Sequence, residues 1–205
     1  MSPKVSDAYK EEKRAAILEG ALHCFTEKGF QATKVEDIVR HLGMSKGAIY
    51  GYFASKEDMY IQMSNGRMDA MVQSLHEQFK NMPGATDRIR FLFGRFRNQS
   101  LDEIRKWMTF HLEFMLYASR QPALVDTLAA YSNKAIQLLR EIFEEGKRTG
   151  ECRQDLDENA ATYLFWAVRD GLALQFLLDG EAADYGRYLN EAEQMVLRYI
   201  GNASS

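Results

Sequence analysis

The segment spanning residues 33–56 constrains the fold more than any other part of this 205-residue chain. Within it, residues 35–42 carry apolar side chains at i, i+1 and i+4, a spacing that predicts a short helix. Gly43 follows at the position where a helix end favours glycine, because glycine enters the left-handed region without a Cβ penalty. Ser45 then suits the N-cap of a second short helix. Two such helices joined by a tight turn make a helix-turn-helix, whose second helix can lie in a DNA major groove.

Two capping boxes predict where the neighbouring helices begin. Thr33-x-x-Glu36 is expected to fix the start of the helix at residue 35, and Ser55-x-x-Asp58 is expected to open a long helix ending near Met82. In each box, the hydroxyl accepts a hydrogen bond from a backbone N–H group that the helix leaves unpaired.

The whole chain is predicted to be all-α, with about nine helices and no strand signal. Only three prolines occur, and strong helix formers are frequent. Beyond the two short helices, the pattern predicts helices at residues 10–28, 55–82, 86–98, 101–119, 122–150, 157–179 and 184–200.

The segment G-M-S-K-G-A-I-Y-G-Y-F-A-S-K-E-D-M, residues 43–59, closely resembles the signature of TetR-type transcriptional repressors. The preceding F-T-E-K-G-F-Q-A-T-K-V-E-D-I-V-R-H-L matches as well. The resemblance implies an N-terminal three-helix helix-turn-helix DNA-binding domain at residues 1–56. It further implies a C-terminal helical bundle at residues 57–205 that senses a ligand and dimerises. The implied function is sequence-specific transcriptional regulation by a homodimer, released from an inverted-repeat double-stranded DNA operator by a small-molecule effector.

The candidate DNA contacts lie on faces that the core does not need, or near helix N-termini that can hold a phosphate. They are Thr33, Lys34, Ser45, Lys46, Gly47, Ala48, Tyr50, Gly51, Tyr52 and Lys56. The resemblance places Tyr50 and Lys56 among the phosphate-contacting positions. Gly51 stands where the family often carries a large residue, so base readout is expected to depend on Lys46 and on close backbone approach. The alternative is a solvated three-helix bundle with incidental tyrosines.

The charge distribution allows DNA binding without demonstrating it. The formal net charge of the chain is −3. Residues 1–56 hold nine Lys and Arg against seven Asp and Glu, whereas the remainder holds seventeen against twenty-two. Because phosphates are neutralised locally, a mildly basic domain on an acidic body is workable.

The middle of the chain, which the resemblance assigns to effector binding, is unusually apolar and aromatic. An aromatic stripe is more often core than pocket, but ligand sites between helices also have apolar walls with a few polar groups. The candidate effector residues are Trp107, Phe110, His111, Phe114, Trp166, Arg169 and Asp170. His111 is also interpreted as a hydrogen-bonded core histidine.

Arg169 and Asp170 are charged residues in an apolar helix. They are adjacent and therefore about 100° apart on the helix, an arrangement expected to prevent a good ion pair between them. Charges in such surroundings need a partner. The partner is expected on another helix, on the second subunit, or in the effector, and a structural buried pair with a residue such as Glu113 is the competing interpretation.

The last two helices are the predicted dimer surface. Each carries residues that recur at helical spacing on one face, and Gly171 would permit close approach of two helices. The candidate interface residues are Leu164, Val168, Gly171, Gln175 and Leu178, followed by Tyr188, Ala192, Met195 and Tyr199.

Other classes of protein find little support in the sequence. Cys24 and Cys152 are isolated, and the four histidines lack metal-ligand spacing, so neither a disulfide framework nor a metal site nor a cofactor is expected. The chain also lacks a G-x-S-x-G, Walker or G-x-G-x-x-G motif, so an enzyme is a remote option. No run of about 20 apolar residues and no signal peptide occurs, which favours the cytoplasm and no membrane association. The main competing hypothesis is an all-helical interaction protein that has lost DNA binding.

Overall fold

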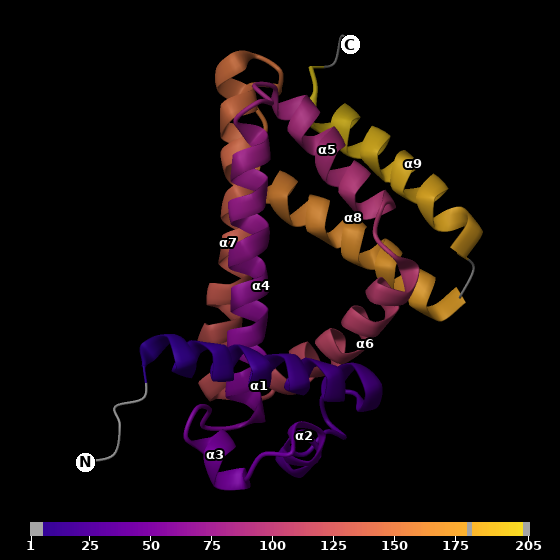
Figure 1. Ribbon diagram of the computed structural model, residues 1–205. Helices are drawn as coiled ribbons and strands as arrows, with labels where there is room; N and C mark the ends of the chain where they lie inside the picture. Colours follow the sequence, from indigo (N-terminus) through magenta and orange to yellow (C-terminus); the bar gives the residue numbers. More distant parts are fainter. Residues whose placement is uncertain (1–5, 180–181, 203–205) are drawn as a thin grey trace. The chain divides into compact units, whose positions relative to one another are not determined.

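The structure, a computed structural model, describes residues 6–179 and 182–202, and in those two ranges it is built from helices alone (Figure 1). The predicted all-α class is therefore confirmed. The helices are α1 Asp7–Lys28, α2 Val35–Leu42, α3 Lys46–Tyr50, α4 Lys56–Phe79, α5 Ala85–Arg97, α6 Leu101–Ala118, α7 Pro122–Thr149, α8 Glu158–Asp179 and α9 Ala182–Ile200.

Three helix starts depend on side-chain caps, and one of them differs from its prediction. The Ser55 hydroxyl accepts a hydrogen bond from the Asp58 N–H at 3.2 Å, as predicted. For α2 the predicted cap is wrong by one residue: the N-cap is Lys34, whose backbone N–H donates to the Asp37 carboxylate at 3.0 Å. At the start of α8, the Asp157 carboxylate accepts from the backbone N–H of Asn159 at 2.9 Å.

The chain divides into two compact units. Unit 1 comprises residues 1–67 and 109–129, and unit 2 comprises residues 68–108 and 130–205. Consequently α4, α6 and α7 each contribute residues to both units. These units are defined by packing, so they do not test the predicted division of DNA-binding and ligand-sensing roles at residue 56, which stays a prediction.

The core of unit 1 is a cluster of aromatic rings that joins α1 and α4 to the second part of α6. Phe25, Phe30 and Phe110 are 0% exposed. The Tyr60 ring of α4 stacks on Phe114 of α6 with ring centroids 3.6 Å apart. This cluster fixes α1 and α4 relative to the second part of α6, because interlocked rings in a dense core resist displacement.

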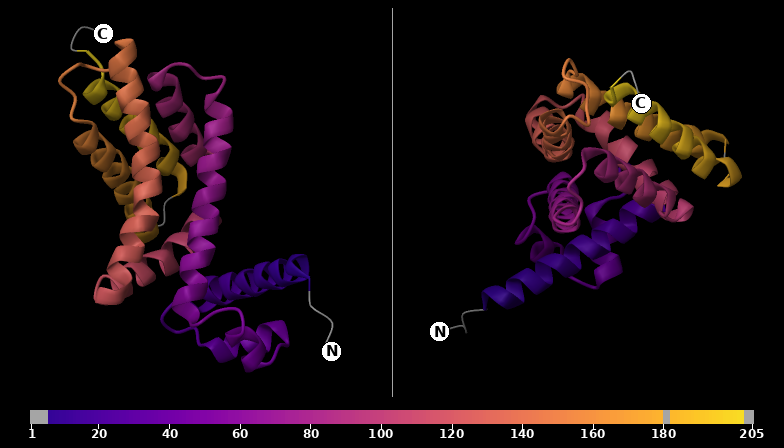
Figure 2. Two further views of the ribbon diagram at one scale, coloured as in Figure 1. Left: turned by 90° about the vertical axis from the view of Figure 1, so that its left-hand side faces the viewer. Right: turned by 90° about the horizontal axis from the view of Figure 1, so that it is seen from above.

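Unit 2 has a separate core, in which α9 packs on both α5 and α8 (Figure 2). Phe93 of α5 and Phe165 of α8 are 0% exposed and meet edge to face, with ring centroids 5.3 Å apart. An ion pair from Arg97 Nη1 to Glu193 Oε2, 2.6 Å long, joins α5 to α9. Neither core includes a membrane-spanning element: among the described residues, no helix has the length and apolar character needed to cross a bilayer.

Candidate nucleic-acid interface

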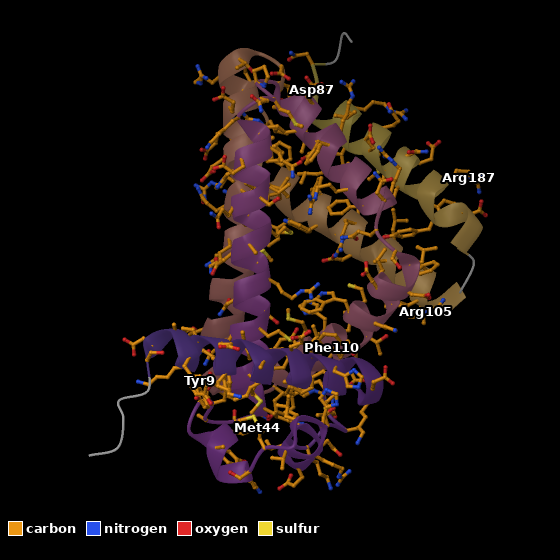
Figure 3. All side chains as sticks on the ribbon, in the orientation of Figure 1. Tyr9, Met44, Asp87, Arg105, Phe110 and Arg187 are labelled. Atoms are coloured by element: carbon orange, nitrogen blue, oxygen red, sulfur yellow. The ribbon has the colours of Figure 1, made fainter. Side chains whose placement is uncertain are left out.

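The turn between α2 and α3 has the backbone geometry that a helix-turn-helix requires. Gly43 adopts φ 62° and ψ 24°, the left-handed conformation that glycine tolerates best. Met44, labelled in Figure 3, follows in the turn and donates its N–H to the Val39 carbonyl at 3.2 Å. The Ser45 hydroxyl then accepts from the Ala48 N–H at 3.1 Å and caps α3. The predicted glycine turn and serine cap are both confirmed.

A salt bridge holds α2 against α1. Lys28 Nζ lies 2.6 Å from Asp37 Oδ1, and Asp37 also caps α2 through the Lys34 N–H. The hydrogen bond from Lys28 and that from the Lys34 backbone hold the pKa of the Asp37 carboxyl below its usual range. One carboxylate thus fixes both the start of α2 and its position on α1.

Most of the predicted DNA contacts are accessible on the surface of unit 1. Lys34, Ser45, Lys46, Gly47, Tyr50 and Gly51 are exposed, Ala48, Tyr52 and Lys56 are half-buried, and Thr33 is buried. A Cβ atom added at Gly47 would meet nothing within 4 Å. The N-terminal face of α3 is therefore open, so a DNA backbone can approach the main chain closely there.

Lys46 is the cation at the start of α3. Its ammonium lies 2.5 Å from Glu36 Oε1 and 5.8 Å from the centre of the Tyr50 ring. The hydrogen bond from Lys46 to Glu36 raises the pKa of the lysine and lowers that of the carboxyl. Because both side chains are more than half exposed, at 54% and 55%, this pair contributes little to stability and is open to exchange for a phosphate.

Lys56 has a structural role that the sequence did not indicate. Its ammonium donates to the carbonyl oxygens of Phe30 and Thr33, both at 2.9 Å, and of Gln31 at 3.2 Å. An ammonium has three N–H donors, and here each has a carbonyl acceptor. Burial lowers the pKa of Lys56. The side chain therefore holds together the loop between α1 and α2.

Thr33 also belongs to the interior of this loop. Its side chain is 0% exposed, and its hydroxyl lies 2.7 Å from the Gly29 carbonyl oxygen and 3.1 Å from that of Cys24. The hydroxyl cannot reach a phosphate unless the loop opens. The predicted contact at Thr33 therefore has no support from the geometry of its side chain.

The predicted effector residues on the second part of α6 lie in the core of unit 1. Phe110, labelled in Figure 3, and Phe114 are 0% and 1% exposed and pack against aromatic rings of α1 and α4. The ring of His111 forms a hydrogen bond with the Tyr60 hydroxyl, in agreement with its interpretation as a hydrogen-bonded histidine. This packing favours a core role for all three, and a ligand contact at these positions stays a prediction.

The other predicted effector residues lie in unit 2. Trp107, on the first part of α6, is half-buried. On α8, Arg169 Nη1 forms an ion pair with Asp170 Oδ1 at 2.6 Å. The expectation that these adjacent residues cannot pair is wrong, because the long arginine side chain reaches across the angle between them. Glu113, named as a possible partner, belongs to unit 1, where its carboxylate accepts from the Gln31 N–H at 3.2 Å.

A shallow groove of about 230 Å³ is also present in unit 2. It lies between His76 and Phe79 of α4 and Leu138 and Glu141 of α7. None of the predicted effector residues lines it. This groove therefore gives no support to the effector site expected from the sequence.

The predicted dimer residues on α8 and α9 are mostly exposed in the single chain. Leu164, Tyr188, Met195 and Tyr199 are 48%, 45%, 50% and 37% exposed, and Leu178 is 71% exposed. Gly171 and Gln175 are exposed and Val168 is half-buried. Ala192 differs, because it is 5% exposed and faces the interior of unit 2. Ala192 therefore lies on the side of α9 that faces the core of unit 2, beside the exposed residues of the predicted dimer surface.

Sequence reasoning missed one residue that belongs with Trp166 and Arg169. Thr162 is 0% exposed on α8, and its hydroxyl has no hydrogen-bond partner among the described residues. It precedes Trp166 by four residues and Arg169 by seven, a spacing that places all three on one face of a helix. That spacing was the sequence signal that could have identified Thr162.

The family is established by comparison with known proteins. A profile described as "Bacterial regulatory proteins, tetR family" matches residues 17–63, and one described as "BetI-type transcriptional repressor, C-terminal" matches residues 97–203, more than half of the chain. The fatty acid metabolism regulator protein of Bacillus subtilis (strain 168) is 21% identical over 194 residues, 94% of this chain and 98% of that one.

Two solved structures share the fold at low sequence identity. The transcriptional regulator FadR from Bacillus subtilis, in complex with stearoyl-CoA, superposes with a TM-score of 0.71 at 20% identity, covering 90% of this chain and 97% of that one. A transcriptional regulator from Saccharomonospora viridis, in complex with choline, gives 0.79 at 20% identity and covers 94% and 99%.

A capped helix-turn-helix with an open recognition helix, within an all-α chain, defines a DNA-binding transcriptional regulator. This chain belongs to the TetR family of bacterial regulatory proteins.

Proposed function

We propose that two copies of this chain form a repressor that binds an inverted-repeat operator and that a small-molecule effector releases from it. The observation that carries the proposal is the open N-terminal face of α3. Ser45, Lys46, Gly47 and Tyr50 are exposed there, on a helix fixed by a glycine turn and a serine cap. A regulator of this kind acts on chromosomal DNA, so it works in the cytoplasm.

The proposed footprint divides into positioning and reading contacts. Lys34 and Tyr50 position the domain through phosphates, which carry little sequence information. Lys46 and the backbone at Gly47 read base edges in the major groove, where each base pair presents a distinct pattern. The DNA-binding domain of one subunit reads one half-site, and the two domains of the dimer, about 34–36 Å apart, read successive major grooves.

An exposed apolar stripe on α8 and α9 supports the dimer. Leu164, Leu178 and Met195 are each about half exposed or more, at 48%, 71% and 50%. Side chains of this kind gathered on one face mark interaction surfaces in soluble proteins. A second copy of the chain is the natural occupant, because a two-fold dimer places the same surface of each subunit against its partner.

Release by an effector requires two arrangements of the dimer. An effector that binds more tightly to the arrangement with mismatched head spacing lowers operator affinity by its differential affinity for the two states. Stearoyl-CoA and choline, bound by two proteins of the same fold, support a small organic effector here.

The competing function is a helical interaction protein without DNA binding. The family relationship and the open, capped α3 both weigh against it. Selection of bound fragments from genomic DNA, followed by affinity measurements across salt concentrations, separates the two, because DNA binding releases counterions and its affinity must fall with salt.

The dimer is tested by Gly171→Leu. A Cβ atom at Gly171 meets nothing within 4 Å in the single chain, so the substitution leaves the subunit folded. We expect monomers in sedimentation and loss of specific operator binding by at least about 100-fold, since each head alone reads half a site.

Gly66→Leu is the matched control for this experiment. Gly66 is also an exposed helical glycine with nothing within 4 Å of an added Cβ atom, but it lies on α4. It should leave both the dimer and operator binding intact. A parent protein that sediments as a monomer while it binds the operator, or a dimeric Gly171→Leu variant, would contradict the proposed interface.

A further inference from the structure

The helix α3 is too short to hold its own position. It spans five residues, and isolated helices shorter than about 12–15 residues are marginal in water, because nucleation costs more than a few backbone bonds return. Its orientation therefore depends on contacts at its two ends. The glycine turn and the Ser45 cap fix the start. The link from α3 to α4, residues 51–55, must be fixed by other groups.

Arg14 of α1 contacts this link and the helix that follows it. Its Nη1 lies 3.5 Å from the Tyr52 carbonyl oxygen, and its Nη2 donates to Gln62 Oε1 of α4. The guanidinium also lies over the ring of Phe53, which is 1% exposed, with Cζ 4.9 Å from the ring centroid. A planar guanidinium can make these contacts at once, because its N–H groups lie in one plane while its face stacks on a ring.

A chain of hydrogen bonds continues from Gln62 back to the link. Gln62 Nε2 donates to Asp58 Oδ1 at 2.6 Å, and Asp58 Oδ2 accepts from the Ala54 N–H at 2.9 Å. We call Arg14, Gln62 and Asp58 the Arg14 network. It joins α1, the start of α4 and the backbone after α3, all within unit 1. The end of α3 is thus fixed on both sides.

The surroundings of Arg14 separate two possible roles. Its acceptors are a carbonyl and an amide oxygen, both uncharged, so the guanidinium keeps its positive charge close to α3. That charge could attract a phosphate. However, Arg14 is half-buried, and its contacts direct the guanidinium toward Phe53 and Gln62. This geometry favours the positioning of α3 over a contact with DNA.

The position of α3 matters more for reading bases than for binding phosphates. Hydrogen bonds to base edges require a defined depth and angle of the helix in the major groove. Phosphate contacts are largely independent of sequence and supply most non-specific affinity. A loosened link should therefore reduce specific binding and leave non-specific binding nearly intact.

We propose that Arg14 is a positioning residue that sets the sequence specificity of DNA binding by fixing the end of α3, without contacting DNA itself. This inference deepens the proposed function and rests on operator binding through α3. It assigns to α1 a part in specificity that is separate from the predicted DNA contacts.

Hydrogen exchange without DNA tests the structural half of the proposal. In Arg14→Met, we expect faster exchange of the Tyr52, Phe53 and Ala54 amides, because the link loses its contacts with α1 and α4. The Met44 amide, in the turn before α3, is the internal control and should exchange at the parental rate. Parental exchange rates at all three link amides would overturn the proposal.

Binding to two duplexes of equal length tests the functional half. One contains the operator selected from genomic DNA, and the other contains the same bases in scrambled order. At a temperature where parent and variant are folded, Arg14→Met should weaken operator binding by about 10-fold, the scale of one lost base contact. Affinity for the scrambled duplex should change by less than about two-fold, and the salt slope should stay constant. Equal loss on both duplexes, or a slope lower by about 1, would identify a phosphate contact and overturn the proposal.

Three further variants separate geometry from charge. Arg14→Lys keeps the charge but lacks the planar fork, so it should retain most of the specificity defect. Gln62→Met keeps Arg14 and interrupts the network, so it should weaken operator binding in the same selective way. Arg90→Met is the control, because it removes an exposed arginine of α5, in unit 2, that pairs with Asp87. It should leave both affinities unchanged.

Rescue by Arg14→Lys would show that charge alone is needed and would overturn the proposal, as would parental specificity in Gln62→Met. A parent protein that does not distinguish the two duplexes would contradict the proposed repressor function. Loss of discrimination in the parent and retention of discrimination in Arg14→Met are different results, so the two failures remain distinguishable.

Discussion

The loop between α1 and α2 and the buried face of α8 differ in whether their polar groups have hydrogen-bond partners. In the loop, the Lys56 ammonium meets three carbonyl oxygens and the Thr33 hydroxyl lies close to two. On α8, Thr162, Trp166 and Arg169 each bury a polar atom without a partner among the described residues. Thr33 and Thr162 are both 0% exposed, so burial alone does not explain the difference.

The difference indicates which region is complete within the single chain. A saturated network rigidifies the element that it joins, whereas a partly satisfied one is costly until a partner arrives. The loop between α1 and α2 is preorganised, because its bonds are made within the single chain. On the buried face of α8, Thr162, Trp166 and Arg169 each keep a polar atom without a partner among the described residues, at a cost in folding free energy.

The largest expected effect on folding comes from Lys56→Met. It leaves three carbonyl oxygens of the loop without their donor, and we expect the free energy of unfolding to fall by about 3 kcal/mol in denaturant titrations. Lys80→Met is the control: Lys80 forms an exposed pair with Glu77, so its loss should cost less than about 0.5 kcal/mol. If the two variants were equally stable, the bonds of Lys56 in the loop would contribute no more to stability than the exposed ion pair of Lys80.

The same Lys56 variant tests the predicted phosphate contact. At a temperature where parent and variant are both folded, the slope of log affinity against log salt should fall by about 1 if Lys56 neutralises a phosphate. An unchanged slope would remove Lys56 from the footprint and leave it with the structural role alone.

A matched pair of threonines tests the contrast at single atoms. Thr33 and Thr162 are both 0% exposed, but only Thr33 has hydrogen-bond partners among the described residues. Thr33→Val should therefore destabilise the protein by about 1–2 kcal/mol, because the one O–H donor near the Gly29 and Cys24 carbonyl oxygens is lost. Thr162→Val should change stability by less than about 0.5 kcal/mol, or increase it, because no bond is lost.

Thermal and denaturant unfolding of both valine variants provide the measurement. Equal destabilisation by the two substitutions would show that Thr162 has a partner in the folded chain. The contrast between the two threonines would then disappear.

Local sequence patterns predicted the helix-turn-helix well. Gly43 and Ser45 act within a few residues of the chain, so their roles follow from spacing and from the conformational preferences of glycine and serine. Competition between neighbouring caps was harder to predict. Thr33 and Lys34 are both placed to cap α2, and Thr33 is lost to the interior because carbonyl groups of α1 and the following loop lie close to its hydroxyl.

Contacts between residues far apart in the chain could not be predicted from the sequence. The carbonyl groups that bind Lys56 come from residues 23 to 26 positions earlier, and only the folded loop brings them together. The division of α6 is a similar case. Its periodicity predicted one aromatic face, but that periodicity cannot show that Phe110 and Phe114 pack with α1 and α4 in unit 1 while Trp107 belongs to unit 2.

The smallest expected effect on stability is at Lys46, which forms an exposed ion pair with Glu36. Lys46→Ala should change the free energy of unfolding by less than about 0.5 kcal/mol, because its pair with Glu36 is solvated. It should nevertheless weaken operator binding, relax the preference for the base that Lys46 reads, and lower the salt slope, because a cation leaves the interface. Glu36→Gln makes the reverse test: without the competing carboxylate, Lys46 is freed for phosphate or base, and affinity should rise several-fold at low salt while stability stays constant. Binding isotherms at three or more salt concentrations measure both variants. An unchanged slope for Lys46→Ala, together with weaker binding by Glu36→Gln, would show that the ion pair positions α3 and that Lys46 does not contact DNA.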